Sequence, residues 1–295
     1  MDTLESLRRK LSGAEDLKSV VRTMKAVAAS NIGQYETAVS SLVDYYRTVS
    51  LGIIAYFKQE KINSLIKNNE PKANNENVIC AIVFGSDQGL VGQFNDSLTE
   101  FVSQSLQGLS GRKEIWAVGE RVQLLLSDIG YNTSKLFNVP SSVHAITALI
   151  QQILAQSEEL FNDDIKNEVY VFHNQPLSAA DYKPTIQRLF PLDETWRQSL
   201  TVLSWPTKLI PQVIGAEKPT LLALIHAYLF TSLYKACAES LASENASRLA
   251  AMQRAEKNID ELLDELSHQF HSLRQSSIDE ELFDVVSGFE VMKDD

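Results

Sequence analysis

Two histidines and two acidic residues near the end of the chain have the spacing of a metal site on a helix. His268 and His271 are three residues apart, with Asp264 and Glu265 one helical turn earlier, so side chains of the right type could meet around one cation. A solvated helix face accounts for the same residues, because such a face is rich in polar side chains. We favour the solvated face and expect no metal site.

The residues that could act as nucleophiles lack the sequence context of a catalytic site. Cys80 and Cys237 are the two cysteines, too few for a disulfide framework or a four-ligand zinc site. Cys80 lies in an apolar run and is expected to be a buried thiol. No nucleophile elbow or cysteine–histidine signature frames the serines, histidines and aspartates. We therefore expect no catalytic residue in this chain.

A glycine-rich loop, FGSDQGLVGQFN, lies between an expected strand and an expected helix, where many proteins bind phosphate. Its glycines, Gly85, Gly89 and Gly92, do not have the G-x-G-x-x-G spacing of dinucleotide sites, and no G-K-[ST] follows them. Asp87 would also repel a phosphate. We interpret the loop as a structural turn and expect no cofactor.

Composition excludes some classes of function. Of the 295 residues, 44% are hydrophobic and 22% charged, as in soluble globular proteins. The net charge of −11 argues against nucleic acid as a ligand, since phosphates require a basic face. The first residues have no apolar signal core, and polar side chains interrupt the most hydrophobic window, Leu221 to Cys237. We expect a buried helix there, no transmembrane segment and a cytosolic location.

The chain from Pro219 to its last residues is expected to form a single helix, roughly 100 Å long at 1.5 Å per residue. Its apolar residues have the spacings of three, four and seven that a coiled-coil partner requires. They are Leu249, Met252, Ile259, Leu263, Leu266, Phe270 and Leu273, followed by a shifted stripe of Ile278, Leu282, Val285 and Phe289.

Residues 2 to about 62 are expected to form a first long helix. Its apolar stripe alternates by three and four along Leu4, Leu7, Leu11, Ala14, Leu17, Val21, Met24 and Ala28. Gly13 and Gly33 interrupt it, and a closely packed neighbouring helix would explain both. The charged residues of 8 to 25 are mostly basic, whereas those of 256 to 295 are mostly acidic. An antiparallel coiled coil would pair these two segments.

Between the two helices the pattern becomes that of alternating strands and helices. Expected strands are 78–84, 114–118, 168–172 and 185–190, and expected helices are 89–106, 120–126 and 141–160, with Pro176, Pro184 and Pro191 in loops. The fold expected is an α/β domain with a mainly parallel sheet, inserted between two long terminal helices that form an antiparallel coiled coil. The expected domains are 1–66 (first helix), 67–77 (linker), 78–204 (α/β domain) and 205–295 (last helix).

Three segments resemble the γ subunit of F-type ATP synthases: VVRTMKAVAASNI (20–32), ESLASENASRLAAMQRAEKNIDELLDEL (239–266) and RQSSIDEELFDVVSG (274–288). The loop SDQGLVGQFN is similar to the family's first strand-to-helix turn. The resemblance implies a central rotor shaft without an active site or bound nucleotide. It also implies a hetero-oligomer with the α, β and ε subunits and the c-ring, peripheral on the cytoplasmic face of the membrane.

The resemblance also implies which residues contact the β subunit. Met24 and Lys25 match the family's TMK or AMK segment, and Arg248 matches its SRL or ARM position. Arg274, Gln275 and Glu281 match a polar catch written RQ-x-x-I-T-x-E, in which Asp279 here replaces the usual threonine.

The segment SWPTKLIPQVIGAEKPTLLALIHAYLFTSLYKACAESLAS lacks the acidic, aromatic YIFEPS phrase of most family members. It is similar instead to γ subunits of alternative, N-type ATPase operons, often proposed to pump sodium. The residues themselves leave two other functions open: a stand-alone α/β enzyme with helical extensions, favoured by the strand–glycine–helix turn, and a coiled-coil adaptor without a motor role.

Overall fold

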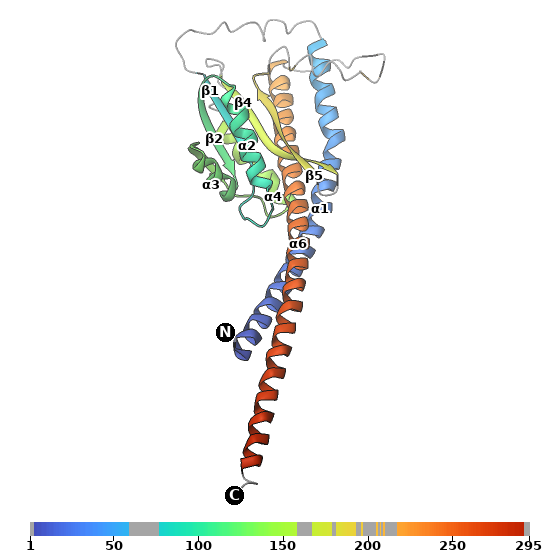
Figure 1. The fold of residues 1–295 in the computed structure, drawn as a ribbon. Coiled ribbons are helices and arrows are strands. Elements are labelled where there is room, and N and C mark those ends of the chain that lie inside the picture. Colours follow the sequence, from blue (N-terminus) through green and yellow to red (C-terminus); the bar gives the residue numbers. More distant parts are fainter. Residues whose placement is uncertain are drawn as a thin grey trace. The chain divides into compact units, whose positions relative to one another are not determined.

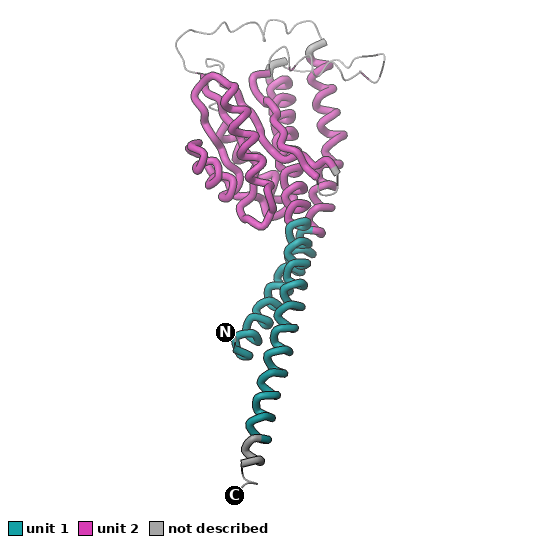
Figure 2. Tube along the Cα trace, in the orientation of Figure 1, with its two compact units in different colours: residues 1–28, 249–295 teal, residues 29–248 magenta. Residues whose placement is uncertain are grey.

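The computed structural model describes residues 3–58, 77–157, 167–178, 181–192 and 217–291, together with residues 196, 205, 207 and 209. The elements in chain order are α1 (Leu4–Lys58), β1 (Val78–Phe84), α2 (Phe94–Gln107), β2 (Arg112–Val118), α3 (Glu120–Asp128), β3 (Thr133–Phe137), α4 (Val143–Ser157), β4 (Glu168–Ser178), β5 (Asp181–Phe190) and α6 (Glu217–Val291). Residues 1–28 and 249–295 make one compact unit, and residues 29–248 make a second (Figure 2).

The larger unit is built on a five-stranded sheet in the order β3-β2-β1-β4-β5 (Figure 1). The first four strands are parallel, and β5 pairs antiparallel with β4. The strand β1 is buried from Ile79 to Phe84, as expected for the centre of a sheet covered on both faces. The prediction of a mainly parallel sheet between two long helices is confirmed.

Alternate residues of the central strands separate two hydrophobic layers. Cys80, Ile82 and Phe84 of β1 belong to a core formed with α4 and with the parts of α1 and α6 that lie in this unit. Ile79, Ala81 and Val83 face the other way and pack with α2 and α3. This alternation follows from the period of two along a strand. It places α6 directly against one face of the sheet.

Some strand boundaries differ from those expected. The strand β3, with sequence TSKLF, was not predicted, because its polar residues and partial exposure belong to a sheet edge. Pro176 and Pro184 were expected in loops, yet they lie inside β4 and β5 and pair with Tyr182 and Asn174. Proline is tolerated where one side of the backbone needs no ladder hydrogen bonds, as in the edge strand β5 and in β4 beyond Phe172, where the pairing with β1 has ended.

The expected helix from Gly89 begins later, at Phe94. Leu90 and Gly92 have φ angles of 61° and 57°, which are incompatible with a right-handed helix. Residues 89–93 therefore form a turn before α2. The linker expected at 67–77 lies outside the described residues except for Asn77, and the domain boundaries stay a prediction.

In the smaller unit, α1 and α6 run antiparallel. Lys18 Nζ lies 2.5 Å from Asp260 Oδ1, and Arg22 Nε lies 2.8 Å from Glu256 Oε1. Lys25 also forms an ion pair with Glu256. These pairs join the basic segment to the acidic one, as the charge distribution predicted.

One residue of the expected α1 seam was assigned wrongly. Leu17 is 59% exposed, whereas Lys18 is half-buried and continues the heptad spacing of Ala14 and Val21. The sequence interpretation preferred the apolar leucine over the neighbouring lysine. A lysine can occupy this position because its aliphatic stem packs in the seam while its ammonium group reaches Asp260.

The explanation offered for two helix glycines is also wrong. A Cβ atom placed on Gly13 or Gly33 would have no neighbouring atom within 4 Å, so neither residue is required by a closely packed helix. Gly52, by contrast, lies where a Cβ atom would be 3.0 Å from the side chain of Leu224 on α6.

Within the described residues, one helix segment, Pro219–Val286 of α6, is long and apolar enough by composition to cross a membrane, and half of its most apolar window is buried. Tyr228, Leu233 and Cys237 of this segment belong to the core of the larger unit. The apolar helix is thus the core helix, which accounts for its hydrophobicity.

Candidate functional site

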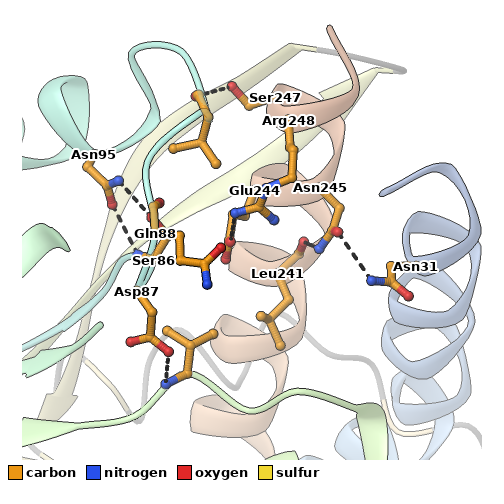
Figure 3. A network of polar contacts seen from close by, with 12 residues as sticks. Asn31, Ser86, Asp87, Gln88, Asn95, Leu241, Glu244, Asn245, Ser247 and Arg248 are labelled. Carbon is orange, nitrogen blue, oxygen red and sulfur yellow. Dashed lines mark hydrogen bonds and ion pairs between the residues drawn. The ribbon is translucent and has the colours of Figure 1, made fainter. Parts of the chain in front are cut away.

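The glycine-rich loop after β1 is held by its own side chains. The side-chain oxygen of Asn95 accepts from the Ser86 backbone N–H at 3.0 Å, and Asn95 Nδ2 donates to Ser86 Oγ at 2.8 Å (Figure 3). Ser86 Oγ in turn donates to the carbonyl of Gln88 at 2.7 Å. The start of α2 is thereby tied to the end of β1.

Asp87 is the acidic residue of this glycine-rich loop. Its Oδ1 accepts from the backbone N–H of Glu120 at 3.2 Å, and its Oδ2 accepts from Val139 N–H at 3.1 Å. Glu120 begins α3, so the carboxylate lies at a helix N-terminus, which favours negative charge. These contacts are those of a structural turn that joins three loops at one end of the sheet.

Two glycines permit this close approach. A Cβ atom on Gly85 would lie 2.3 Å from Val122 Cβ, and one on Gly119 would lie 2.6 Å from the Ser86 carbonyl oxygen. Gly119 also has a φ of 116°, a conformation that only glycine adopts without strain.

The helix α6 contacts this end of the sheet through three buried serines, which we call the serine row: Ser240, Ser243 and Ser247. Ser240 Oγ donates to the carbonyl of Phe84 at 2.8 Å. Ser243 Oγ donates to the carbonyl of Asn174 at 2.9 Å, and Ser247 Oγ donates to that of Val91 at 2.6 Å. Spacings of three and four place all three on one face of the helix.

A buried pair of titratable side chains lies beside the serine row. His173 Nε2 is 2.8 Å from Glu239 Oε2, and the two side chains are 5% and 8% exposed. Glu239 Oε1 is 3.8 Å from Lys235 Nζ. The strand β4 therefore contacts α6 through two consecutive residues, His173 and Asn174.

One turn further along, Arg248 Nη2 donates to Glu244 Oε1 at 2.6 Å (Figure 3). Burial raises the pKa of Glu244 above its ordinary value, the positive charge and hydrogen bond of Arg248 oppose this, and the negative charge of Asp87 adds to it. The next residue, Asn245, accepts from Asn31 Nδ2 of α1 at 3.4 Å. This cluster connects the loop, α6 and α1 within the larger unit.

The residues expected to contact a β subunit are divided between the two units. Met24 and Lys25 are half-buried on α1, and Lys25 is ion-paired with Glu256. Arg274, Gln275 and Glu281 are exposed on α6 in the same unit. Arg248 belongs to the larger unit, where it pairs with Glu244.

The serine row was not recognised from the sequence, in which ESLASENASRLAA was used only for its resemblance to the γ-subunit family. The signal available was the recurrence of serine at spacings of three and four in an otherwise alanine-rich stretch. His268 and His271 are exposed, and the described part of the chain contains no group of three or more side chains suited to a metal ion.

Comparison with known proteins gives one consistent family. A family model described as ATP synthase matches residues 3–292. The ATP synthase gamma chain of Syntrophus aciditrophicus is 27% identical, covering 99% of both chains, and that of Ehrlichia ruminantium strain Gardel is 26% identical, covering 98% of both.

Solved structures share the fold. A chain of the Euglena gracilis mitochondrial ATP synthase (OSCP/F1/c-ring, rotational state 3) has a TM-score of 0.62 and 18% identity, covering 98% of this chain and 94% of that one. A chain of the central stalk/c-ring of the Tetrahymena thermophila enzyme has a TM-score of 0.55 and 19% identity, covering 80% and 99%.

The chain therefore belongs to the ATP synthase gamma chain family. Its function is that of the central-stalk γ subunit of a rotary F-type ATP synthase, a peripheral component of a membrane enzyme.

Proposed function

We propose that the smaller unit of this chain turns inside a hexamer of α and β subunits, and that the α/β part contacts the ε subunit and the c-ring. In this assignment Met24, Lys25, Arg248, Arg274, Gln275 and Glu281 contact β. The observation that carries the proposal is the exposed apolar end of α6, the segment Ile278–Val286.

Five large apolar side chains of that end are exposed: Ile278, Leu282, Phe283, Val285 and Val286. Phe283 alone is 74% exposed. Within the smaller unit, α6 continues past the first residues of α1 (Figure 2), so α1 does not cover this end. Exposed apolar patches mark interaction sites, and a collar of surrounding subunits would cover this segment on every side.

The polar catch lies on the same segment. Arg274 and Glu281 are seven residues apart and thus share a face of the helix, with Ile278 between them. Both are exposed and so are available to a partner. Asp279, in place of the family's threonine, adds a negative charge beside the catch, so its partner on β must supply a donor or a cation.

The other two charged contacts would be made by side chains already paired within the chain. Lys25 and Arg248 retain 34% and 16% exposure. Either the β subunit contacts the exposed part of these two side chains, or their ion pairs with Glu256 and Glu244 break when the complex assembles.

The test is reconstitution of the chain with its α and β subunits, followed by measurement of stoichiometry and ATP hydrolysis. Replacing Leu282 and Phe283 by glutamate should weaken assembly, and Arg274→Ala should weaken it less. The matched control is Leu124→Glu, a change at an exposed leucine of α3 in the larger unit. Normal assembly and activity of the Leu282/Phe283 variant would contradict the proposal.

We also place the chain in the N-type branch and on the cytoplasmic face of the membrane, as a shaft for a proton or sodium pump. The support is the Trp205-Pro206 phrase and the LF-x-x-L motif at Leu229–Leu233, together with the missing YIFEPS phrase. The order of the neighbouring genes tests the assignment to this branch. A separate operon that encodes α, β, ε and c-type subunits beside this chain is expected, and a standard single-copy operon would refute the branch.

A further inference from the structure

We propose that the serine row, with the His173–Glu239 pair beside it, is the joint that transmits torque between α6 and the sheet. Ser240, Ser243 and Ser247 would then be positioning residues for coupling. The inference rests on the proposed contact of the α/β part with the ring, because only a loaded α/β part needs a joint to α6.

The joint consists of several separate contacts between α6 and the rest of the larger unit. Each serine is buried, and each donates to a backbone carbonyl of a different segment: the end of β1, the strand β4 and the loop before α2. The Glu239–His173 contact adds a side-chain pair on β4. Asn174 extends the connection, since its Nδ2 donates to the Phe94 carbonyl at the start of α2 at 3.0 Å.

The three serine hydrogen bonds are directional, and this makes them suited to resist a torque on α6. Apolar packing between a helix and a sheet is non-directional and resists separation more than sliding. Hydrogen bonds weaken steeply when their geometry is disturbed, so three of them along one helix face oppose rotation of α6 about its own axis. The strand ladders hold two of the acceptors, the carbonyls of Phe84 on β1 and Asn174 on β4, whereas the third, that of Val91, lies in the loop before α2.

The same helix contains a matched control. Ser232 of α6 is also buried, at 2% exposure, yet its hydroxyl has no hydrogen-bond partner within the described residues. Ser232→Ala therefore removes a buried serine of α6 without removing a bond to the sheet. It reproduces the chemical change of the serine-row variants and leaves the joint intact.

The experiment uses the complete ATP synthase in vesicles, with the triple variant Ser240→Ala/Ser243→Ala/Ser247→Ala, the three single variants and Ser232→Ala. ATP hydrolysis and ATP-driven ion pumping are measured on the same vesicles. We expect the triple variant to assemble and hydrolyse ATP but to lose pumping relative to hydrolysis. Each single variant should lose part of the pumping relative to hydrolysis. Ser232→Ala should keep the wild-type ratio of pumping to hydrolysis.

The outcomes separate the two proposals. Failure of the wild-type chain to assemble with α and β subunits would refute the proposed function. A wild-type pumping-to-hydrolysis ratio in the triple variant would refute the joint and leave the proposed function standing. Should the triple variant fail to assemble, the single variants decide: a graded loss of the ratio supports the joint, and unchanged ratios overturn it.

Discussion

Arg248 and Glu244 form an ion pair one helical turn apart on α6, with 2.6 Å between Nη2 and Oε1 and side-chain exposures of 16% and 7%. The pair is therefore mostly enclosed by the chain itself. Its environment includes Asp87 of the loop and Tyr35 of α1, both of which interact electrostatically with Glu244.

The first prediction concerns loss of the cation. Arg248→Met leaves a buried carboxylate without its partner, which destabilises proteins by about 3–5 kcal/mol. We expect a loss of that order in the free energy of unfolding by denaturant. The control is the double variant Arg248→Met/Glu244→Gln, which should recover much of the loss. Equal stability of Arg248→Met and wild type would contradict the assigned role.

The second prediction concerns pH. Burial raises the pKa of Glu244 above its ordinary value of 4.5, so the folded chain holds this proton more tightly than the unfolded chain. The contribution to stability is full below pH 4.5 and is lost as the pH rises through the folded pKa. We expect Glu244→Gln to remove this decline in melting curves measured at successive pH values. An unchanged pH profile would refute it.

A third prediction concerns Glu256, whose pKa is shifted the opposite way. Hydrogen bonds from Lys25 and Arg22 lower it, so its contribution to stability is present above its ordinary pKa and is lost as the pH falls through the folded one. Glu256→Lys should raise hydrogen exchange in residues 4–28, and Lys25→Glu in the same chain should reverse part of the rise. Added salt should narrow these differences, since exposed charges are screened.

A fourth prediction uses the two kinds of glycine. Gly13→Ala should stabilise α1 by about 1 kcal/mol, the difference in helix propensity, because a Cβ atom there meets nothing. Gly85→Ala should destabilise the chain strongly, since its Cβ atom would lie 2.3 Å from Val122 Cβ. Thermal unfolding of both variants tests the contrast, and a destabilised Gly13→Ala would contradict it.

The elements recovered best from the sequence were those with a strong apolar period. The strand Val78–Phe84 was predicted with its observed bounds, because an unbroken apolar run flanked by polar residues has few alternatives. The strand TSKLF was missed because its polar edge residues look like a loop until a sheet is present to pair with. Pro176 and Pro184 were expected in loops for the same reason: a proline is tolerated where one side of a strand is unpaired, and the pairing is known only once the sheet is present.

The serine row shows a different limit. The serines of α6 are visible in the sequence, but their hydrogen-bond partners are carbonyl groups of residues up to 156 positions away. Backbone carbonyls are present at every residue, so no sequence pattern marks the ones that will accept. Lys18 illustrates the same point, since its place in the seam depends on Asp260 across the helix pair.

Lysines in the α1 seam bear on the order of events during synthesis. Residues 4–28 are synthesised before the acidic partner segment near residue 260, so this part of α1 is made before its α6 partner exists. Two copies of this helix paired parallel and in register would place Lys18 against Lys18 and Lys25 against Lys25, which disfavours that pairing between nascent chains. The ammonium groups of Lys18 and Lys25 thus favour pairing of α1 with α6 of the same chain over pairing with a second α1.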